Sequence, residues 1–231
     1  AVDKEGYVHG KIHPIGAWTN RSSHVSPNLG NVPSRDEDGK VMRGCWGVAN
    51  PDTHRLVGVD ASGIQACALA HYIGLASGDM EYIELVSNPD IDIHMYNAEK
   101  ANLYIPGMSD SEKAESRKRA KTFFYAFVLG SGFYKNGVLV NPPEEDYDEL
   151  IEYMQRHEIQ KKLEYSMSFS GIPLVRENYA LATKGYQVKT DFIKNVPGLK
   201  EFQEGYIRDL GNRGWVEYLD GRRVAVESAY N

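Results

Sequence analysis

The chain has 231 residues, 42% of them hydrophobic and 25% charged, which is typical of one large or two small globular domains. No apolar run of about 18 residues and no signal-peptide pattern occurs, so we expect no membrane span. The net charge of −6 disfavours a nucleic-acid surface spread over the whole chain, although basic residues cluster at 117–121. The two cysteines, Cys45 and Cys67, lack metal-ligand spacing and are expected to be reduced in a cytoplasmic setting.

Short strands and turns are expected for residues 1–40, which are rich in Gly, Pro, Asn and Ser. Residues 55–60 (RLVGVD) form a short apolar run that ends in an acid, as in a buried strand with a carboxylate at its tip. The apolar periodicity after Gly63 predicts a helix over IQACALAHYIGLAS. Shorter helices are expected at 79–86 and 92–103.

The strongest helix signal lies at 110–129, where Asp110 or Ser111 is expected to cap the N-terminus. This helix is expected to end at Gly130-Ser131-Gly132. Residues 166–188 fit no single pattern. The other expected elements are an exposed turn at 141–149 around Pro142-Pro143, a polar helix at 146–164, helices on both sides of Pro197-Gly198 within 189–211, and a hairpin around Asp220-Gly221.

Asp60 is a candidate metal ligand. The small residues after it, Ala61, Ser62 and Gly63, would let a metal ion and a phosphate come close to the backbone. Mg²⁺ is commonly bound by one or two carboxylates together with phosphate oxygens. The local sequence by itself favours the simpler alternative, in which Asp60 caps the following helix.

A spacing of four residues places Arg117, Lys121, Tyr125 and Leu129 along one face of the expected helix. Two cations followed by an aromatic ring match a nucleoside triphosphate, which has charge at one end and a flat apolar surface at the other. From spacing alone, the simpler interpretation is a surface helix with a solvated basic start and a buried end.

The other polar residues give weaker signals. The loop at 19–33 contains Arg21 and Asn28, which could contact the minor-groove edge of a base pair, although a plain surface loop is the simpler interpretation. His71 and His94 belong to no zinc-binding pattern, and lone histidines more often have a structural role.

Five segments of the chain, taken in sequence order, resemble motifs of family A DNA polymerases, and those of the T7-like phage branch most closely. They touch most of the chain except about 135–188, where an insertion is expected. Five ordered motifs make the resemblance specific. The segments that carry it are TNRSSHVSPNLGNVP at 19–33, VDASGIQACALAH at 59–71 (motif A), DIDIH at 90–94, RKRAKTFFYAFVLGSG at 117–132 (motif B, R-x3-K-x3-[FY]-x3-Y-G) and YLDGRRVAV at 218–226.

The resemblance implies an α+β, right-hand polymerase fold containing part of the palm and the helical fingers. The expected domains are the N-terminal part of the palm with motif A at 1–75, the fingers with motif B and the insertion at 76–205, and a return to the palm with the hairpin at 206–231. The implied reaction is template-directed nucleotidyl transfer with two Mg²⁺ ions, one activating the primer 3′-hydroxyl and one holding the triphosphate.

The resemblance also implies a role for individual residues in the matching motifs. Asp60 would be the first metal carboxylate. Arg117 and Lys121 would bind the triphosphate, and Lys121 would also be the proton donor to the departing pyrophosphate. The further nucleotide contacts would be Tyr125 by stacking, His94 at a phosphate and Gln65 beside the sugar; the DNA contacts would be Arg21 and Asn28 in the minor groove, with Leu129 and Gly130 beside the template base.

Four positions depart from the family pattern or mark a branch of it. Gln65 stands where a Glu usually blocks ribose, so sugar discrimination is expected in an altered form. Cys67 replaces a usual Arg. Leu129 replaces a Tyr beside the template base and can neither stack nor donate a hydrogen bond, so the fidelity associated with that Tyr is not implied here. Tyr125 in place of Phe is typical of the T7 branch and is expected to ease acceptance of dideoxynucleotides.

The family's second metal carboxylate lies in an H-D-E element, and the sequence contains no HDE or HD. Because one carboxylate cannot hold two Mg²⁺ ions in near-octahedral geometry, we expect this chain alone to be a poor catalyst, with a second polypeptide carrying the missing element. The expected function is a fragment or split subunit of a DNA-directed DNA polymerase that acts on DNA primer–template and dNTP in the cytoplasm of an infected bacterial host. The alternative is a non-catalytic, polymerase-derived module that binds DNA or nucleotide; no GxxxxGK[ST] loop supports an unrelated phosphotransferase.

Overall fold

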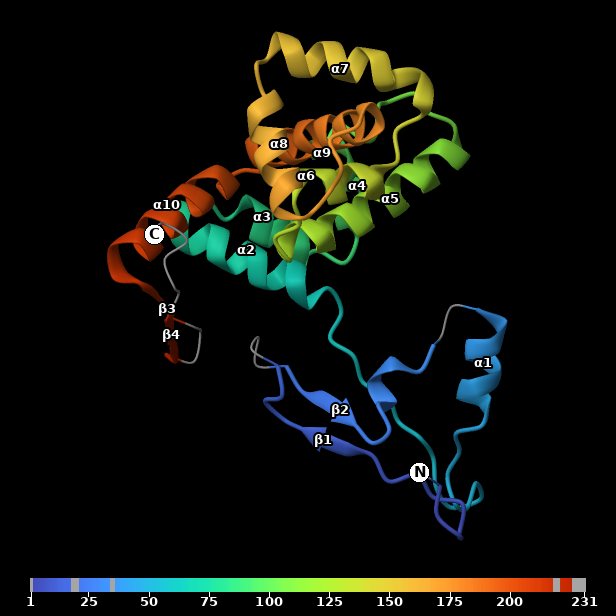
Figure 1. Ribbon diagram of the computed structural model, residues 1–231. Coiled ribbons are helices and arrows are strands. Elements are labelled where there is room, and N and C mark those ends of the chain that lie inside the picture. The colour runs from blue at the N-terminus through green and yellow to red at the C-terminus, as the bar shows by residue number, and fades with distance from the viewer. Residues whose placement is uncertain (1, 18–20, 34–35, 218–220, 226–231) are drawn as a thin grey trace. The chain divides into compact units, whose positions relative to one another are not determined.

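A computed structural model describes residues 2–17, 21–33, 36–217 and 221–225 (Figure 1). The chain divides into two compact units, Ala1–Asp60 and Ala61–Asn231. The palm and fingers boundaries expected near residues 75 and 205 stay predictions. Among the helices in the described ranges, none combines the length and the apolar character that crossing a membrane requires.

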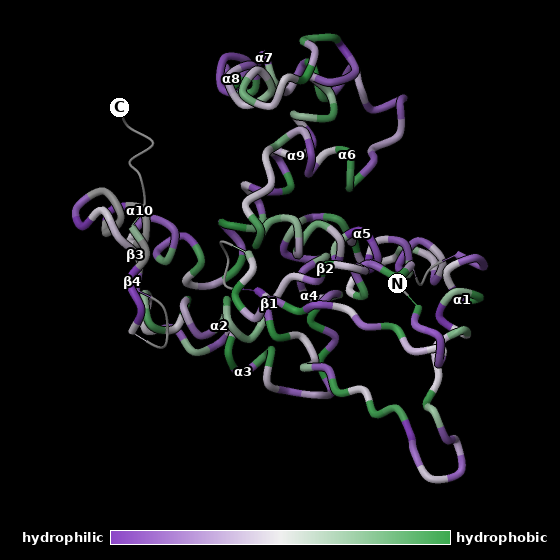
Figure 2. The backbone as a smooth tube through the Cα atoms, turned by 60° about the horizontal axis from the view of Figure 1, so that its bottom comes forward, coloured by the Kyte–Doolittle hydropathy of each residue, from purple (hydrophilic) through white to green (hydrophobic). Residues whose placement is uncertain are grey.

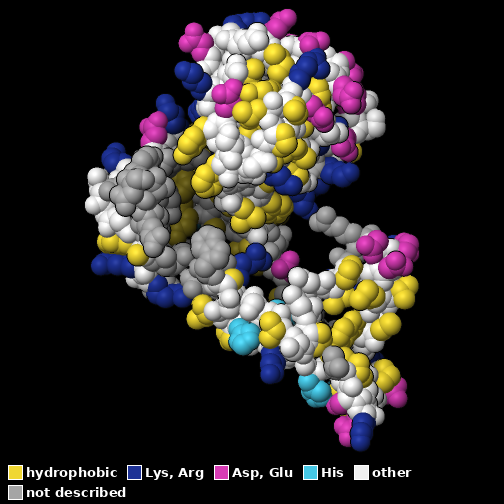
Figure 3. Space-filling view, in the orientation of Figure 1, with side chains coloured by type: hydrophobic (Ala, Val, Ile, Leu, Met, Phe, Trp, Pro, Cys, Tyr) yellow, Lys and Arg dark blue, Asp and Glu magenta, His cyan; other side chains and the backbone are white. Residues whose placement is uncertain are grey.

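The N-terminal unit has short strands, as expected, but also a helix that was not expected. β1 (Lys11–His13) pairs antiparallel with β2 (Ser23–Val25), and a 3₁₀ turn, η1 (Leu29–Asn31), follows. Helix α1 (Glu37–Gly44) begins because the side chain of Asp36 accepts a hydrogen bond from the backbone N–H of Gly39. Figure 3 shows many hydrophobic side chains on the surface of this unit. Val41 and Trp46 are among the exposed hydrophobic residues of the unit.

The prediction of a strand at 55–60 is wrong. These residues are irregular, and the apolar side chains of Leu56, Val57 and Val59 are 73%, 83% and 94% exposed. A strand forms when a neighbouring strand takes up its backbone N–H and C=O groups. Within the described ranges, no strand pairs with 55–60, so its apolar pattern alone does not produce a strand.

The first four helices of the second unit lie where the sequence predicts them, except for one cap, whereas the fifth, at 133–140, was not predicted. Ser109, and not Asp110 or Ser111, is the N-cap of the long helix, and it forms a reciprocal capping box with Glu112. The two expected capping residues lie one and two positions too late, because several adjacent polar residues could each serve as a cap. These helices are α2 (Ile64–Ser77), α3 (Glu81–Ser87), α4 (Ile93–Lys100), α5 (Asp110–Val128) and α6 (Phe133–Val140).

The prediction of a single polar helix at 146–164 is wrong, because the structure has two helices in this region. Glu158 adopts a left-handed backbone conformation (φ +54°), which interrupts the helix. The ambiguous stretch 166–188 lies largely in one long helix, and the helices beside Pro197-Gly198 are confirmed. The elements are η2 (Glu144–Asp146), α7 (Tyr147–Arg156), α8 (Gln160–Phe169), α9 (Arg176–Asn195) and α10 (Leu199–Arg213).

The C-terminal hairpin is confirmed in its strands. β3 (Trp215–Glu217) pairs antiparallel with β4 (Arg223–Ala225), and Val216 lies opposite Val224. Asp220 of the expected turn lies outside the described residues. The hairpin follows α10 directly in the chain (Figure 1).

Aromatic rings form the centre of the helical unit. Phe192 of α9 is fully buried and meets Phe123, Phe124 and Phe127 of α5, with ring centroids 5.5, 6.3 and 5.1 Å away. Edge-to-face pairs of this kind stabilise a core beyond the area that they bury. Helix α2, white to green over most of its length in Figure 2, adds Ile73 to the same core. The core therefore fixes α5, whose other face is available for binding.

Candidate functional site

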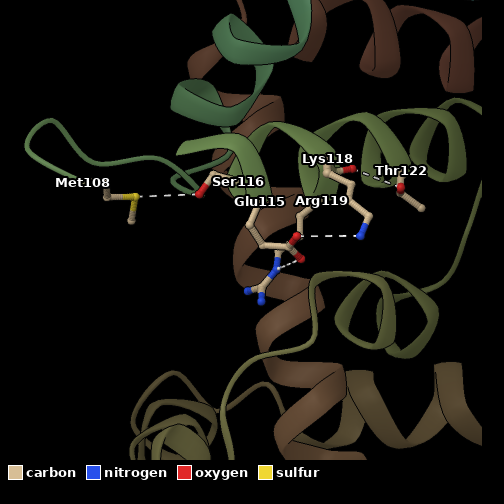
Figure 4. A network of polar contacts seen from close by, with 6 residues as sticks. All are labelled: Met108, Glu115, Ser116, Lys118, Arg119 and Thr122. Atoms are coloured by element: carbon tan, nitrogen blue, oxygen red, sulfur yellow. Dashed lines mark hydrogen bonds and ion pairs between the residues drawn. The ribbon is translucent and has the colours of Figure 1, made fainter. Parts of the chain in front are cut away.

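The basic residues of the cluster at 117–121 on α5 differ in their partners. Lys118 and Arg119 lie near Glu115, with nitrogen–oxygen distances of 3.8 and 3.2 Å (Figure 4). Exposed ion pairs at these i,i+3 and i,i+4 spacings contribute only a few tenths of a kcal/mol to helix stability. Arg117 and Lys121 have no contact with Glu115, so they are the two cations of the cluster that remain for a different role.

Asp92 connects Arg117 to helix α4. One carboxylate oxygen of Asp92 accepts from the backbone N–H groups of His94 and Met95, at 3.0 and 3.3 Å, and so caps α4. The other accepts from Nε of Arg117 at 2.5 Å. The Nη groups of Arg117 have no hydrogen-bond partner among the residues that the structure describes. Asp92 therefore orients the guanidinium while leaving its outer edge able to bind an anion.

The charges around Asp92 also set its ionisation. Burial acts to raise the pKa of Asp92, but the hydrogen bond and charge of Arg117, together with the two amide hydrogen bonds, bring the pKa below its usual value. Asp92 is therefore charged at neutral pH and keeps Arg117 in place.

His94 lies beside the same face of α5. Its ring is 6.0 Å from that of Tyr125, centroid to centroid, and the two meet at 64°. Burial, followed by the positive charges of Lys121 and Arg117, lowers the pKa of His94, while Asp92 opposes the shift. Lys121 itself is exposed and forms no ion pair within the described part of the chain. Four of the predicted nucleotide-binding side chains, those of Arg117, Lys121, Tyr125 and His94, therefore lie on the adjoining helices α4 and α5.

The other predicted site residues of the helical unit lie at helix ends. Gln65 is exposed in the first turn of α2, which packs against α5. Leu129 is the C-cap of α5 and is 78% exposed, and Gly130 has a positive φ of +79°. Because Leu129 follows the last helical residue, its side chain is free of the core and available to a partner.

Three predicted residues lie in the N-terminal unit. Asp60, Arg21 and Asn28 are all exposed, and Asn28 precedes η1. Asp60 does not cap α2, because the N-cap is Gly63, which has a left-handed backbone (φ +62°) and no side chain to bond with. Both simple expectations for Asp60, a strand tip and a helix cap, are therefore wrong, and its carboxylate has no structural partner among the described residues.

The described residues contain no group of three or more His, Cys, Asp or Glu side chains that could share a metal ion. Asp60 is thus a single exposed carboxylate. Mg²⁺ needs about six oxygen ligands, which water, phosphate and further carboxylates usually provide. Asp60 fits the role of one ligand, but these residues do not form a complete metal site.

Asp92 is the residue of this site that sequence reasoning missed. The signal for it was an Asp two residues before His94, at the start of a short helix, which is a common N-cap position. Its hydrogen bond to Arg117, 25 residues further along the chain, has no counterpart in the local sequence pattern.

Replacing Asp92 by alanine is expected to lower the free energy of unfolding by about 1–2 kcal/mol, because α4 loses its N-cap. Asn can still accept the amide hydrogen bonds but carries no charge for Arg117, so Asp92→Asn should cost only about 0.5 kcal/mol at this half-exposed ion pair. Urea denaturation of both variants measures the difference. Equal losses would show that the ion pair, and not the cap, dominates.

The lowered pKa of His94 predicts a pH effect on stability. Below about pH 6.5 the unfolded chain takes up a proton at His94 that the folded chain resists, so the free energy of unfolding should fall as the pH falls through this region. Above it, both states are neutral at His94 and the contribution disappears. His94→Gln should therefore reduce the stability difference between about pH 5.5 and pH 7.5 in urea denaturation. An unchanged difference would contradict the assignment.

Comparison with known proteins identifies the family of the chain. The profile of DNA polymerase family A matches residues 1–167. The chain is 28% identical to the DNA-directed DNA polymerases of Enterobacteria phage T3 and Escherichia phage T7, in each case over 99% of this chain and 28% of the relative. It is 25% identical to DNA polymerase I of Treponema pallidum, over 98% of this chain and 20% of that protein. The resemblance to the T7-like branch is thus confirmed.

A solved structure has the same fold. The POL domain of Pol1 from M. smegmatis, in complex with DNA primer-template and dNTP, gives a TM-score of 0.56 at 19% identity and covers 97% of this chain and 31% of that one. The expected α+β polymerase fold is confirmed by this likeness. The chain spans about 28% of the length of the phage relatives. Because the family profile matches well over half of the chain, the chain belongs to DNA polymerase family A.

Proposed function

We propose that this chain forms the nucleotide-binding and template-binding part of a DNA-directed DNA polymerase. The observation that carries the proposal is the face shared by α4 and α5, where Arg117, Lys121, His94 and Tyr125 lie together. The outer edge of Arg117 and the ammonium of Lys121 have no acidic partner among the described residues. Two available cations beside an aromatic ring fit a triphosphate that is attached to a nucleoside.

In this proposal Arg117 and Lys121 bind the triphosphate, and His94 adds a further phosphate contact. Lys121 also donates a proton to the departing pyrophosphate, which is possible because its ammonium is exposed and carries three donors. Tyr125 stacks on the incoming nucleotide, and Gln65 lies beside its sugar. The proposed DNA contacts are Arg21, Asn28, Leu129 and Gly130.

The proposed reaction is template-directed nucleotidyl transfer with two Mg²⁺ ions, to which Asp60 contributes one carboxylate. Bound Mg²⁺ stabilises the charge that develops on the phosphoryl oxygens. Because the described residues hold no complete metal site, we propose that a second polypeptide carrying an H-D-E element contributes the remaining carboxylate. The proposed location, by analogy with the phage relatives, is the cytoplasm of an infected bacterium.

Primer extension tests the proposal directly. The chain is assayed with primer–template, dNTP and Mg²⁺, first alone and then mixed with a polypeptide that carries the H-D-E segment. Extension in the mixture only is the expected result. Extension by the chain alone would show that another acid of this chain supplies the missing ligand. Binding of primer–template without extension in either sample would favour the non-catalytic binding module.

A further inference from the structure

A second pair of cations, Lys162 and Lys189, lies near the C-terminal end of α5. Lys162 of α8 lies over the rings of Phe133 and Tyr186, with its Nζ 5.6 and 5.0 Å from the two centroids. Lys189 of α9 lies over Phe127 and Phe133, at 5.8 and 5.5 Å. The two lysines thus share the ring of Phe133, which begins α6, and the helices that carry them pack together (Figure 1).

The two ammonium groups contact the same aromatic ring, and no described acid forms an ion pair with either of them. Nζ of Lys189 donates to the backbone oxygen of Ser131 at 3.2 Å, and neither lysine forms an ion pair with a described residue. Burial, followed by the charge of Lys162, lowers the pKa of Lys189. Cation–π contacts offset part of the repulsion. An anion bound by both lysines would offset more of this repulsion.

The place of this pair in the chain indicates which anion it binds. Ser131, which holds Lys189, directly follows Leu129 and Gly130, the two residues proposed to lie beside the template base. A template DNA strand that passes the templating position must continue over neighbouring residues of the protein. Each nucleotide of this strand carries one negatively charged phosphate. The lysines lie over the faces of Phe133 and Tyr186, so these faces are occupied by cations and the site favours a phosphate over a stacked base.

We propose that Lys162 and Lys189 bind a backbone phosphate of the single-stranded template ahead of the templating base. This inference rests on the proposed function, because it assumes that a template strand reaches Leu129. Lysine acts here as a point charge on a flexible stem, which suits a phosphate whose exact position changes as the strand advances. The exposed Lys162 makes the first contact, while the half-buried Lys189 is fixed by Ser131.

The test compares two DNA ligands by fluorescence anisotropy, a primer–template with a long 5′ template overhang and the same duplex with a blunt end. Lys162→Gln combined with Lys189→Met is expected to weaken overhang binding by about tenfold and to reduce the salt slope of log K by about 1. Binding of the blunt duplex should be unchanged. Lys161→Gln, one residue from Lys162 and also exposed, is the matched control and should leave both ligands unaffected.

A single variant and a competition experiment distinguish a template site from a loss of folding and from a site for free anions. Lys162→Gln alone changes an exposed side chain, so its expected weakening of overhang binding, about threefold, does not depend on core packing. Equal losses with overhang and blunt DNA, or no loss at all, would overturn the template site. Competition by inorganic phosphate as effective as that by single-stranded DNA would show a site for free anions instead. If the unaltered chain binds neither DNA nor dNTP, the proposed function itself fails. If the unaltered chain binds both and the Lys162 and Lys189 variants behave like Lys161→Gln, only the inference about the template site fails.

Discussion

Replacing Lys121 by alanine is expected to weaken dNTP binding by roughly 10- to 100-fold, which corresponds to the loss of one or two charged hydrogen bonds to phosphate. The ammonium of Lys121 is exposed, one helical turn from Arg117, and has no ion pair among the described residues. Its removal leaves the core intact, because the buried side of α5 is formed by other residues such as Phe123 and Phe124. The loss should therefore appear in binding and not in stability.

Lys118 provides a matched control for Lys121. It lies on the same helix, one turn from Lys121, and is also exposed, but its Nζ is 3.8 Å from Glu115 and so already has an acidic partner. Lys118→Ala should leave dNTP affinity within about twofold of the unaltered chain. Titration of a fluorescent dNTP analogue measures both variants, and urea denaturation checks that both remain folded. Similar losses for Lys118→Ala and Lys121→Ala would show that the chain attracts nucleotides only through its general basic charge.

Several helices of the second unit, among them α2 and α5, were predictable because their signals are local. Apolar periodicity gave α2 its observed bounds, Ile64–Ser77, and Pro197-Gly198 separated α9 from α10. The strand expected at 55–60 was not predictable in the same way, since a strand depends on a partner that may be distant in the chain. The helix break at Glu158 was also not predictable, because a left-handed backbone conformation at a residue other than Gly leaves no clear signal in the sequence.

The candidate site was predictable in part for a similar reason. A spacing of four residues places Arg117, Lys121 and Tyr125 on one face of α5 whatever the rest of the fold does. Spacing does not reveal which cation already has a partner. The pairing of Arg117 with Asp92 and of Lys118 with Glu115 depends on how α4 meets α5 and on side-chain geometry. The motifs thus predicted Arg117, Lys121, Tyr125 and His94, whereas Asp92 and the partners of the cations are seen only in the structure.

Replacing Gly185 by alanine is expected to destabilise the helical unit by about 3 kcal/mol or more, although alanine is the better helix former. Gly185 of α9 is buried against α6, where a Cβ would overlap the backbone oxygen of Phe133 and lie 2.6 Å from the backbone nitrogen of Gly137. Backbone atoms cannot turn aside as a flexible side chain can. Helices α6 and α9 would have to separate along their contact.

Gly205 of α10 shows what the same substitution does in open space. The nearest atom to a Cβ there is 3.9 Å away, so Gly205→Ala should raise the free energy of unfolding by about 0.5–1 kcal/mol through the unfolded chain and helix propensity. Urea denaturation of the two variants measures opposite signs. Because Phe133 carries the ring shared by Lys162 and Lys189, Gly185→Ala should also weaken binding of DNA with an overhang. Two stabilising substitutions would mean that α6 and α9 are not in close contact at Gly185.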